Sequence, residues 1–225
     1  MLVFTRYFIS LTCLVYSALS LQVRAESSAD YLVSESLASQ VRHSIVKITT
    51  VQQNVDFKRP WVYPQTQAIS GSGFFVGNKR ILTNAHVVAN ARFITVQKDG
   101  DSKQFTAYVE SIAHDADLAV LTVIEKNFFN GLKALVFGGI PDLHSPVSAV
   151  GYPTGGEQLA VTKGIVSRID YSLYSHTNYH LHLLIQVDSA INPGASGGPV
   201  LQKGKVVGVA FQAFRSGQNI DLAHA

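Results

Sequence analysis

Three short segments of the sequence contain residue types that, brought together, can transfer an acyl group. His86 ends one apolar stretch, Asp117 opens another, and Ser196 lies in the glycine-rich segment at residues 192–199. A serine hydroxyl is a weak nucleophile until a neutral imidazole accepts its proton. A carboxylate beside that imidazole fixes its tautomer and stabilises the imidazolium that forms. These residue types therefore predict nucleophilic chemistry at a serine.

The glycines around Ser196 meet a second requirement of the same chemistry. Glycine lets the backbone turn so that neighbouring N–H groups point at one position. Such groups stabilise the oxyanion of a tetrahedral intermediate, and losing one of them costs roughly 10²–10³ in rate. We therefore expect the segment around Ser196 to supply both the nucleophile and N–H donors.

Each segment taken alone also has a purely structural interpretation, as a strand-end histidine, a turn-capping acid or a simple glycine turn. Their joint occurrence in the order His, Asp, Ser favours catalysis. This order is that of the chymotrypsin class and differs from the Ser–Asp–His order of α/β-hydrolases. Asp115 is a rival carboxylate, but Asp117 is preferred because the apolar stretch begins directly after it.

Composition and pattern predict an all-β globular protein. The 225 residues are 47% hydrophobic and 15% charged, with 12 Phe, 9 Tyr and a single Cys, which excludes a disordered, collagen-like or coiled-coil chain. Short β-like runs recur between glycine turns, at the spacing of a barrel or sandwich. The expected strands are residues 44–51, 73–76, 80–83, 92–97, 103–112, 118–124, 146–150, 158–169, 182–187, 198–201 and 206–211. No stretch after residue 43 is typical of a long amphipathic helix.

Residues 1–25 are typical of a secretory signal peptide. A short, weakly cationic start precedes an uncharged run at residues 7–21, and Val23 and Ala25 suit cleavage after Ala25. The alternative is an uncleaved anchor, although the run is shorter than the roughly 20 residues that span a bilayer. With cleavage we expect no stable membrane anchor, no cysteine for a disulfide, and a periplasmic or extracellular location. Residues 26–43 are polar, with apolar spacing for a short helix.

Charge gives no indication of a nucleic-acid partner. The formal net charge is +3, and without Arg6 and Arg24 the balance is 16 basic against 15 acidic residues, or +1. No run of Lys or Arg is present, so the electrostatic pattern of nucleic-acid binding is missing.

The sequence resembles a known family, the Deg/HtrA-type serine proteases of the chymotrypsin fold. The matching motifs are residues 70–74, 83–88 and 117–121 in the first half, and residues 151–153, 161–168 and 192–199 in the second. The resemblance implies a first β-barrel at residues 44–130, with His86 and Asp117, and a second at residues 131–225, with Ser196. It also implies that residues 206–212 form the strand that pairs with the substrate backbone.

The resemblance further assigns roles to individual residues. His86 would be the general base, Asp117 its orienting partner and Ser196 the nucleophile, with the backbone N–H groups of Gly194 and Ser196 as the oxyanion hole. Family members usually carry Asn where this sequence has Ala195, a change of small expected effect because that position contributes its backbone.

The implied activity is that of a serine endopeptidase acting in protein quality control. Ala190 and the neighbouring Ile191 would line the specificity pocket, which implies small or medium apolar residues before the scissile bond. The implied partners are unfolded or exposed polypeptide substrates, hydrolysed through an acyl-enzyme without a cofactor. A homo-oligomer is possible, because trimers are common among relatives.

The last residues depart from the family pattern. Relatives continue into a further Gly- and aromatic-rich strand, whereas this sequence ends with residues 221–225. We therefore expect the second barrel to lack its last strand and to expose an open edge. This favours an alternative function, a catalytically inactive, truncated, protease-like module that binds polypeptides. The presence of all three triad residues favours the enzyme.

A histidine cluster gives a third interpretation. His176, His180 and His182 suggest a metal-binding β protein, since positions 180 and 182 share a strand face. No cysteine or clear carboxylate ligand accompanies them, so we predict an exposed hairpin and no metal site.

Overall fold

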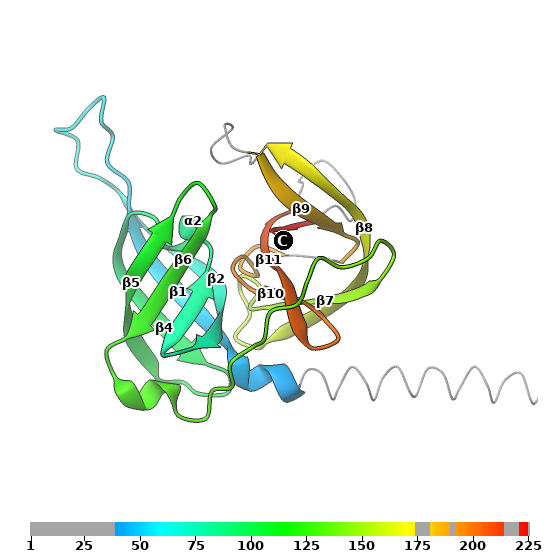
Figure 1. Cartoon of the computed structure of the whole chain (residues 1–225). Helices are drawn as coiled ribbons and strands as arrows, with labels where there is room; N and C mark the ends of the chain where they lie inside the picture. The colour runs from blue at the N-terminus through cyan, green and yellow to red at the C-terminus, as the bar shows by residue number, and fades with distance from the viewer. Residues whose placement is uncertain (1–38, 174–180, 190–191, 214–220, 225) are drawn as a thin grey trace, which may run out of the picture. The chain divides into compact units, whose positions relative to one another are not determined.

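The computed structural model describes residues 39–173, 181–189, 192–213 and 221–224 (Figure 1). The predicted signal peptide, most of the polar segment after it, and the residues His176, His180, Ala190 and Ile191 lie outside this part. Residues Val41–Ala225 belong to one compact unit. Among the described residues, no helix combines the length and the apolar character needed to cross a membrane.

The first barrel is formed by six antiparallel strands in the order β1-β2-β3-β6-β5-β4, and it closes on itself. Its elements are η1 (Arg42–Ser44), β1 (Ile45–Gln53), β2 (Thr66–Gly77), β3 (Arg80–Thr83), α2 (Ala85–Val88), β4 (Ala91–Lys98), β5 (Gln104–Ala113), β6 (Leu118–Val123) and η2 (Lys126–Phe129). Side chains alternate between the core and the outside, most regularly along β6. Ile48, Ile81, Leu121 and Phe128 are fully buried in this core.

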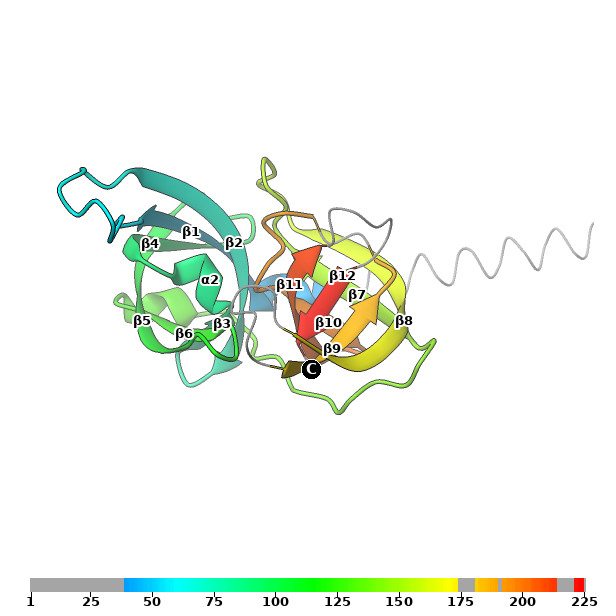
Figure 2. The same cartoon turned by 90° about the horizontal axis from the view of Figure 1, so that it is seen from above.

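The second barrel repeats the same strand order. Its strands are β7 (Pro146–Gly151), β8 (Ala160–Leu173), β9 (Leu181–Val187), β10 (Pro199–Gln202), β11 (Lys205–Ala213) and β12 (Asp221–His224). They close in the order β10-β11-β12-β9-β8-β7, which read backwards is the order of the first barrel (Figure 2). Val166, Ile185, Val200 and Ala223 lie in its core. The prediction of an all-β, chymotrypsin-like fold with two barrels is confirmed.

The expectation that the second barrel lacks its last strand was wrong. β12 pairs with β11, where Ala223 is opposite Ala210, and with β9, where Ala223 is opposite Ile185. Leu222 and Ala223 are buried. The four residues of β12 have no strong strand pattern of their own. Their extended conformation comes from pairing with the two neighbouring strands, β11 and β9. Unpaired N–H and C=O groups on two neighbouring strands accept any short extended segment that can bury its side chains.

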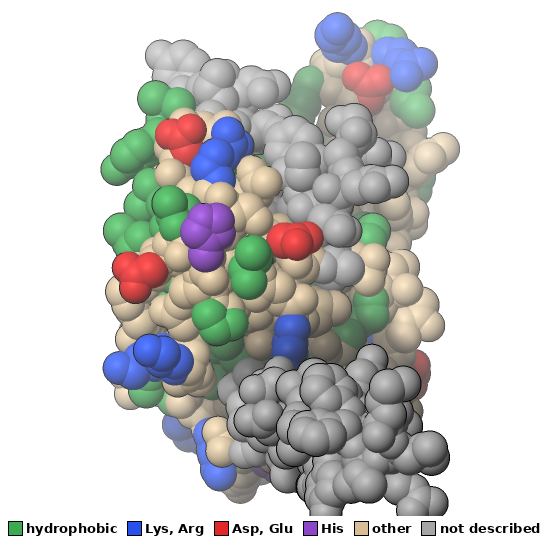
Figure 3. Space-filling view, turned by 90° about the vertical axis from the view of Figure 1, so that its right-hand side faces the viewer, with side chains coloured by type: hydrophobic (Ala, Val, Ile, Leu, Met, Phe, Trp, Pro, Cys, Tyr) green, Lys and Arg blue, Asp and Glu red, His purple; other side chains and the backbone are tan. Residues whose placement is uncertain are grey.

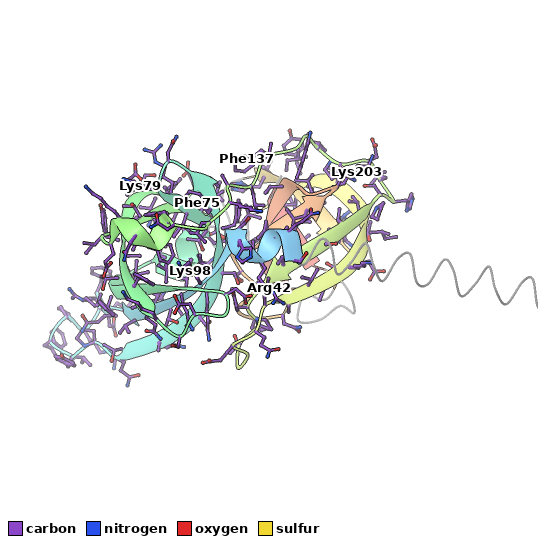
Figure 4. The ribbon with its side chains drawn as sticks, turned by 90° about the horizontal axis from the view of Figure 1, so that it is seen from below. Arg42, Phe75, Lys79, Lys98, Phe137 and Lys203 are labelled. Atoms are coloured by element: carbon purple, nitrogen blue, oxygen red, sulfur yellow. The ribbon has the colours of Figure 1, made fainter. Side chains whose placement is uncertain are left out.

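Hydrogen bonds link the two barrels, and a ring contact holds the connection between them against the first barrel. The connection after β6 returns along β2, where the N–H of Leu135 donates to the carbonyl of Phe75 at 2.9 Å. The ring of Phe137 lies 6.3 Å from that of Phe74, and Figure 4 labels Phe137 on this connection and Phe75 on β2. Inside the unit, Ser72 of β2 contacts the segment that carries Ser196. These contacts bring residues from both halves of the chain to one place.

The surface carries mixed charge. On the face drawn in Figure 3, acidic and basic side chains of the described residues are interspersed among apolar ones. Large aromatic side chains protrude from the loop between β1 and β2, where Phe57, Trp61 and Tyr63 are each at least 80% exposed.

Candidate active site

His86 sits on a single helical turn directly after β3. Its neighbours Ala85, Val87 and Val88 are buried, whereas the imidazole keeps 27% of its surface exposed. The buried apolar side chains therefore anchor the turn in the first core, whereas the histidine stays at the surface. This local arrangement explains why an apolar segment carries a polar residue in its middle.

The carboxylate of Asp117 holds the imidazole of His86 by two contacts. The Nδ1 of His86 lies 2.8 Å from Oδ2 and 3.1 Å from Oδ1, and the backbone N–H of His86 donates to Oδ1 at 2.9 Å. The Asp117 side chain is 1% exposed. Since an ionised carboxylate only accepts, Nδ1 of the neutral imidazole carries the hydrogen, which leaves a lone pair on Nε2. This is the tautomer that a general base requires.

The backbone of Asp117 is fixed by a residue that the sequence interpretation did not assign. The side-chain amide of Asn84 donates to the carbonyl of Asp117 at 3.0 Å, and the N–H of Ala85 donates to the same oxygen at 3.1 Å. Asp117 has a φ of 48°, which Asp tolerates better than most residues. Asn84 lies two positions before His86 in the motif at residues 83–88, but nothing in that motif records its contact with Asp117.

The turn that carries Ser196 has every carbonyl oxygen partnered from residue 192 to residue 196. Three of these carbonyls accept from backbone N–H groups of the second half: Asn192 from Ala195, Pro193 from Thr154, and Ala195 from Gly198. The other two accept from Ser72: the carbonyl of Gly194 from its hydroxyl, and that of Ser196 from its N–H. Each peptide plane of the turn is thereby held in one orientation.

Two N–H groups of this turn behave differently. Within the part of the chain that the structure describes, the N–H groups of Gly194 and Ser196 donate to no protein acceptor. Gly194 has a φ of 94°, and a Cβ built there would lie 2.6 Å from the carbonyl oxygen of Tyr152. Only glycine therefore fits at this position. The turn is thus held by its carbonyl groups while two N–H groups remain available to a ligand.

The hydroxyl of Ser196 points to β11. Its Oγ lies 3.5 Å from the carbonyl oxygen of Phe211, and the described structure contains no hydrogen bond between this Oγ and His86. The chain therefore brings His86 and Asp117 into direct contact and anchors Ser196 between β2 and β11, without closing the third link. Catalytic hydrogen bonds are often long before a substrate binds.

The segment before the turn approaches β8 closely. A Cβ built at Gly164 would lie 2.3 Å from the carbonyl oxygen of Asp188 and 2.7 Å from the Cβ of Ser189. Gly164, which lies in the motif at residues 161–168, therefore lets the chain before Ala190 pass against the strand. Ala190 and Ile191 themselves lie outside the described residues.

Tyr152 connects the loop after β7 to the first barrel. Its hydroxyl lies 3.2 Å from Oδ1 of Asp99, whose Oδ2 forms an ion pair with Arg42 at 3.1 Å. Burial raises the pKa of Tyr152 well above its ordinary range, and the charge of Asp99 adds to the effect. The phenol therefore stays neutral and can donate to Asp99.

Two members of the histidine cluster, His176 and His180, lie outside the described residues. In the described ranges, no group of three or more His, Cys, Asp or Glu side chains could hold a metal ion. His182 pairs across the sheet with Ser172.

Comparison with known proteins decides the family. The model of the trypsin-like peptidase domain matches residues 71–209, a range that contains His86, Asp117 and Ser196. The chain belongs to the trypsin-like serine proteases of the Deg/HtrA type. This Deg/HtrA-type chain is 43% identical to a serine protease DegP homolog of Plasmodium falciparum over 175 residues, which cover 76% of it and 20% of the relative.

Further relatives and solved structures agree. Protease Do-like 4, mitochondrial, of Arabidopsis thaliana is 43% identical over 193 residues, 86% of this chain and 37% of the relative. This chain thus spans well under half the length of these two relatives. The active form of the Rv3671c protease from M. tuberculosis has a TM-score of 0.72 at 26% identity, over 86% of this chain and 81% of that one. The HtrA-type protease AlgW with a decapeptide has a TM-score of 0.66 at 26% identity, over 84% and 62%.

Proposed function

We propose that this chain is a serine endopeptidase in which His86 is the general base, Asp117 its orienting partner and Ser196 the nucleophile. The observation that carries the proposal is the contact of His86 Nδ1 with the buried carboxylate of Asp117 at 2.8 Å. A lone solvent-facing histidine would not need a buried carboxylate that accepts from both its ring and its backbone. Membership of a serine protease family supports the same assignment.

The reaction follows from these positions. With substrate bound, His86 Nε2 accepts the proton of Ser196 as Oγ attacks the scissile carbonyl. The oxygen of the tetrahedral intermediate accepts from the N–H groups of Gly194 and Ser196, which are unpartnered in the described structure. His86 then gives its proton to the leaving amine, which leaves an acyl-enzyme. Water, deprotonated by His86, hydrolyses that ester and restores Ser196. Asp117 keeps its charge throughout.

The proposed substrates are unfolded or exposed polypeptides with a small or medium apolar residue before the scissile bond. Ala190 and Ile191 support this preference through the family resemblance alone. An extended peptide suits a site bordered by strand β11, and AlgW was solved with a decapeptide. Peptide substrates that vary only in the residue before the bond measure the preference, and equal rates for basic and small apolar residues would contradict it.

A fluorophosphonate probe tests the catalytic assignment. This reagent phosphonylates only a serine whose hydroxyl is activated, with loss of fluoride. We expect the chain to be labelled, and the variants Ser196→Ala and His86→Ala to remain unlabelled. Mass spectrometry of the tryptic peptide that contains residues 192–199 locates the adduct. No labelling of a chain that unfolds cooperatively would overturn the proposal.

The alternative of an inactive binding module rested on an open second barrel. β12 closes that barrel, so this argument no longer applies. We also propose export across a membrane with a leader at residues 1–25, a role in protein quality control, and assembly with further copies. Curated relatives include mitochondrial and chloroplastic proteases. N-terminal sequencing of the mature chain tests the leader, and an intact Met1 in exported protein would contradict cleavage.

A further inference from the structure

Ser72 of β2 lies at a buried contact between the first barrel and the serine turn. It is fully buried, and two of its polar atoms, N and Oγ, form three hydrogen bonds with the second half of the chain. Its N–H donates to the carbonyl of Ser196 at 2.8 Å. Its carbonyl accepts from the hydroxyl of Thr83, in the first barrel, at 2.7 Å.

The hydroxyl of Ser72 has a defined donor and acceptor role. The N–H of Tyr152 donates to Oγ at 2.8 Å, so the hydroxyl hydrogen is directed to the carbonyl of Gly194, also at 2.8 Å. A hydroxyl carries one donor and two acceptor positions. Ser72 thus joins two loops of the second barrel through a group that belongs to the first.

The carbonyl of Gly194 lies in the chain between the two available N–H groups. The peptide before it is held by the 2.6 Å bond from the N–H of Thr154 to the carbonyl of Pro193. The Gly194–Ala195 peptide, to which this carbonyl belongs, is held by the Ser72 hydroxyl. The Gly194–Ala195 peptide lies between the peptides that carry the two N–H groups, so its rotation would change the orientation of these groups relative to each other at the position that an oxyanion occupies.

We propose that Ser72 is a positioning residue that holds the N–H groups of Gly194 and Ser196 in the orientation that binds the oxyanion. This inference rests on the proposed serine protease activity and deepens it. Ser72→Ala leaves the Tyr152 N–H and the Gly194 carbonyl without their shared partner in a buried site, so the turn relaxes. The effect falls on the transition state, where the N–H groups act, and spares the binding of the peptide.

The test compares Ser72→Ala with Ser70→Ala. Ser70 precedes Ser72 by two residues on the same strand, and within the described structure its buried Oγ has no hydrogen-bond partner. The probes are a chromogenic peptide ester and a peptide boronic acid, whose tetrahedral adduct with Ser196 places an oxygen at the two N–H groups. Peptide binding is measured separately, with Ser72→Ala added to a Ser196→Ala chain.

We expect Ser72→Ala to lower kcat and to weaken boronic acid binding by roughly 10- to 100-fold. Peptide affinity in the Ser196→Ala background stays unchanged, and Ser70→Ala behaves as the parent chain. If Ser72→Ala does not fold, Ser72→Cys replaces it, because sulfur fills the site but is a weak donor and acceptor. The same selective loss is expected there.

The outcomes separate the two proposals. A parent chain with neither esterase activity nor boronic acid binding overturns the proposed function. An active parent chain whose Ser72 variant keeps its kcat, or loses peptide affinity in the same proportion as kcat, overturns the role of Ser72 alone.

Discussion

At the scale of single residues, the acid of the proposed triad gives the sharpest prediction. Asp117→Asn keeps the shape of the side chain but presents an amide hydrogen to Nδ1 of His86, which favours the wrong tautomer. We expect kcat to fall roughly 10³- to 10⁴-fold, with little change in KM or in melting temperature. Steady-state kinetics with a peptide substrate measures the loss.

Asp115 offers the matched control for that substitution. It lies in the same turn and is exposed, whereas Asp117 is 1% exposed. Asp115→Asn should leave kcat within the range of the parent chain. Equal losses of kcat in the two variants would show that activity depends on the turn and not on the carboxylate of Asp117.

At the scale of elements, β12 is the part of the fold whose contribution is easiest to test. Ala223 is fully buried between β11 and β9, so Ala223→Asp places a carboxylate in the second core without a partner. We expect the free energy of unfolding to fall by about 3 kcal/mol or more. Urea denaturation followed by fluorescence provides the measurement.

The control for β12 is a charge change at an exposed strand position. Lys205 begins β11 and is exposed, so Lys205→Asp should change the free energy of unfolding by less than about 0.5 kcal/mol. A tolerated Ala223→Asp would mean that the second barrel does not need β12 to stay folded.

At the scale of the whole molecule, Tyr152 makes stability depend on alkaline pH. Burial, together with the charge of Asp99, raises its pKa well above the ordinary value of about 10. Below about pH 10, the ordinary pKa, the tyrosine is protonated in both the folded and the unfolded chain. Above it, only the unfolded chain releases the proton, so stability falls with rising pH, by up to about 1.4 kcal/mol per pH unit.

Tyr152→Phe removes this titration along with the hydrogen bond to Asp99. We expect the variant to be less stable than the parent near neutral pH, and to lose less stability between about pH 10 and 11. Tyr171→Phe, at an exposed position of β8, should follow the parent at each pH. Thermal unfolding across this range decides the matter, and parallel curves for Tyr152→Phe and the parent would contradict the role of Tyr152.

Local patterns predicted the parts of this protein whose causes are local. The strand at residues 80–83 was predicted with its observed bounds. A turn before it and the His86 segment after it mark both of its ends in the sequence. β2 begins at Thr66, well before the expected residue 73, because its exposed first residues pair with the end of β1 instead of forming a pattern of their own.

The sequence by itself determined the class of fold and led to the proposed chemistry. The types and order of His86, Asp117 and Ser196 predicted nucleophilic catalysis, and alternating apolar runs predicted strands. Only the tertiary structure decided that β12 closes the second barrel, that Asn84 fixes Asp117, and that Ser72 reaches Gly194 across 122 positions of sequence. The physical reason is that a buried polar group takes whatever partner the fold places beside it, and no spacing in the sequence records that partner.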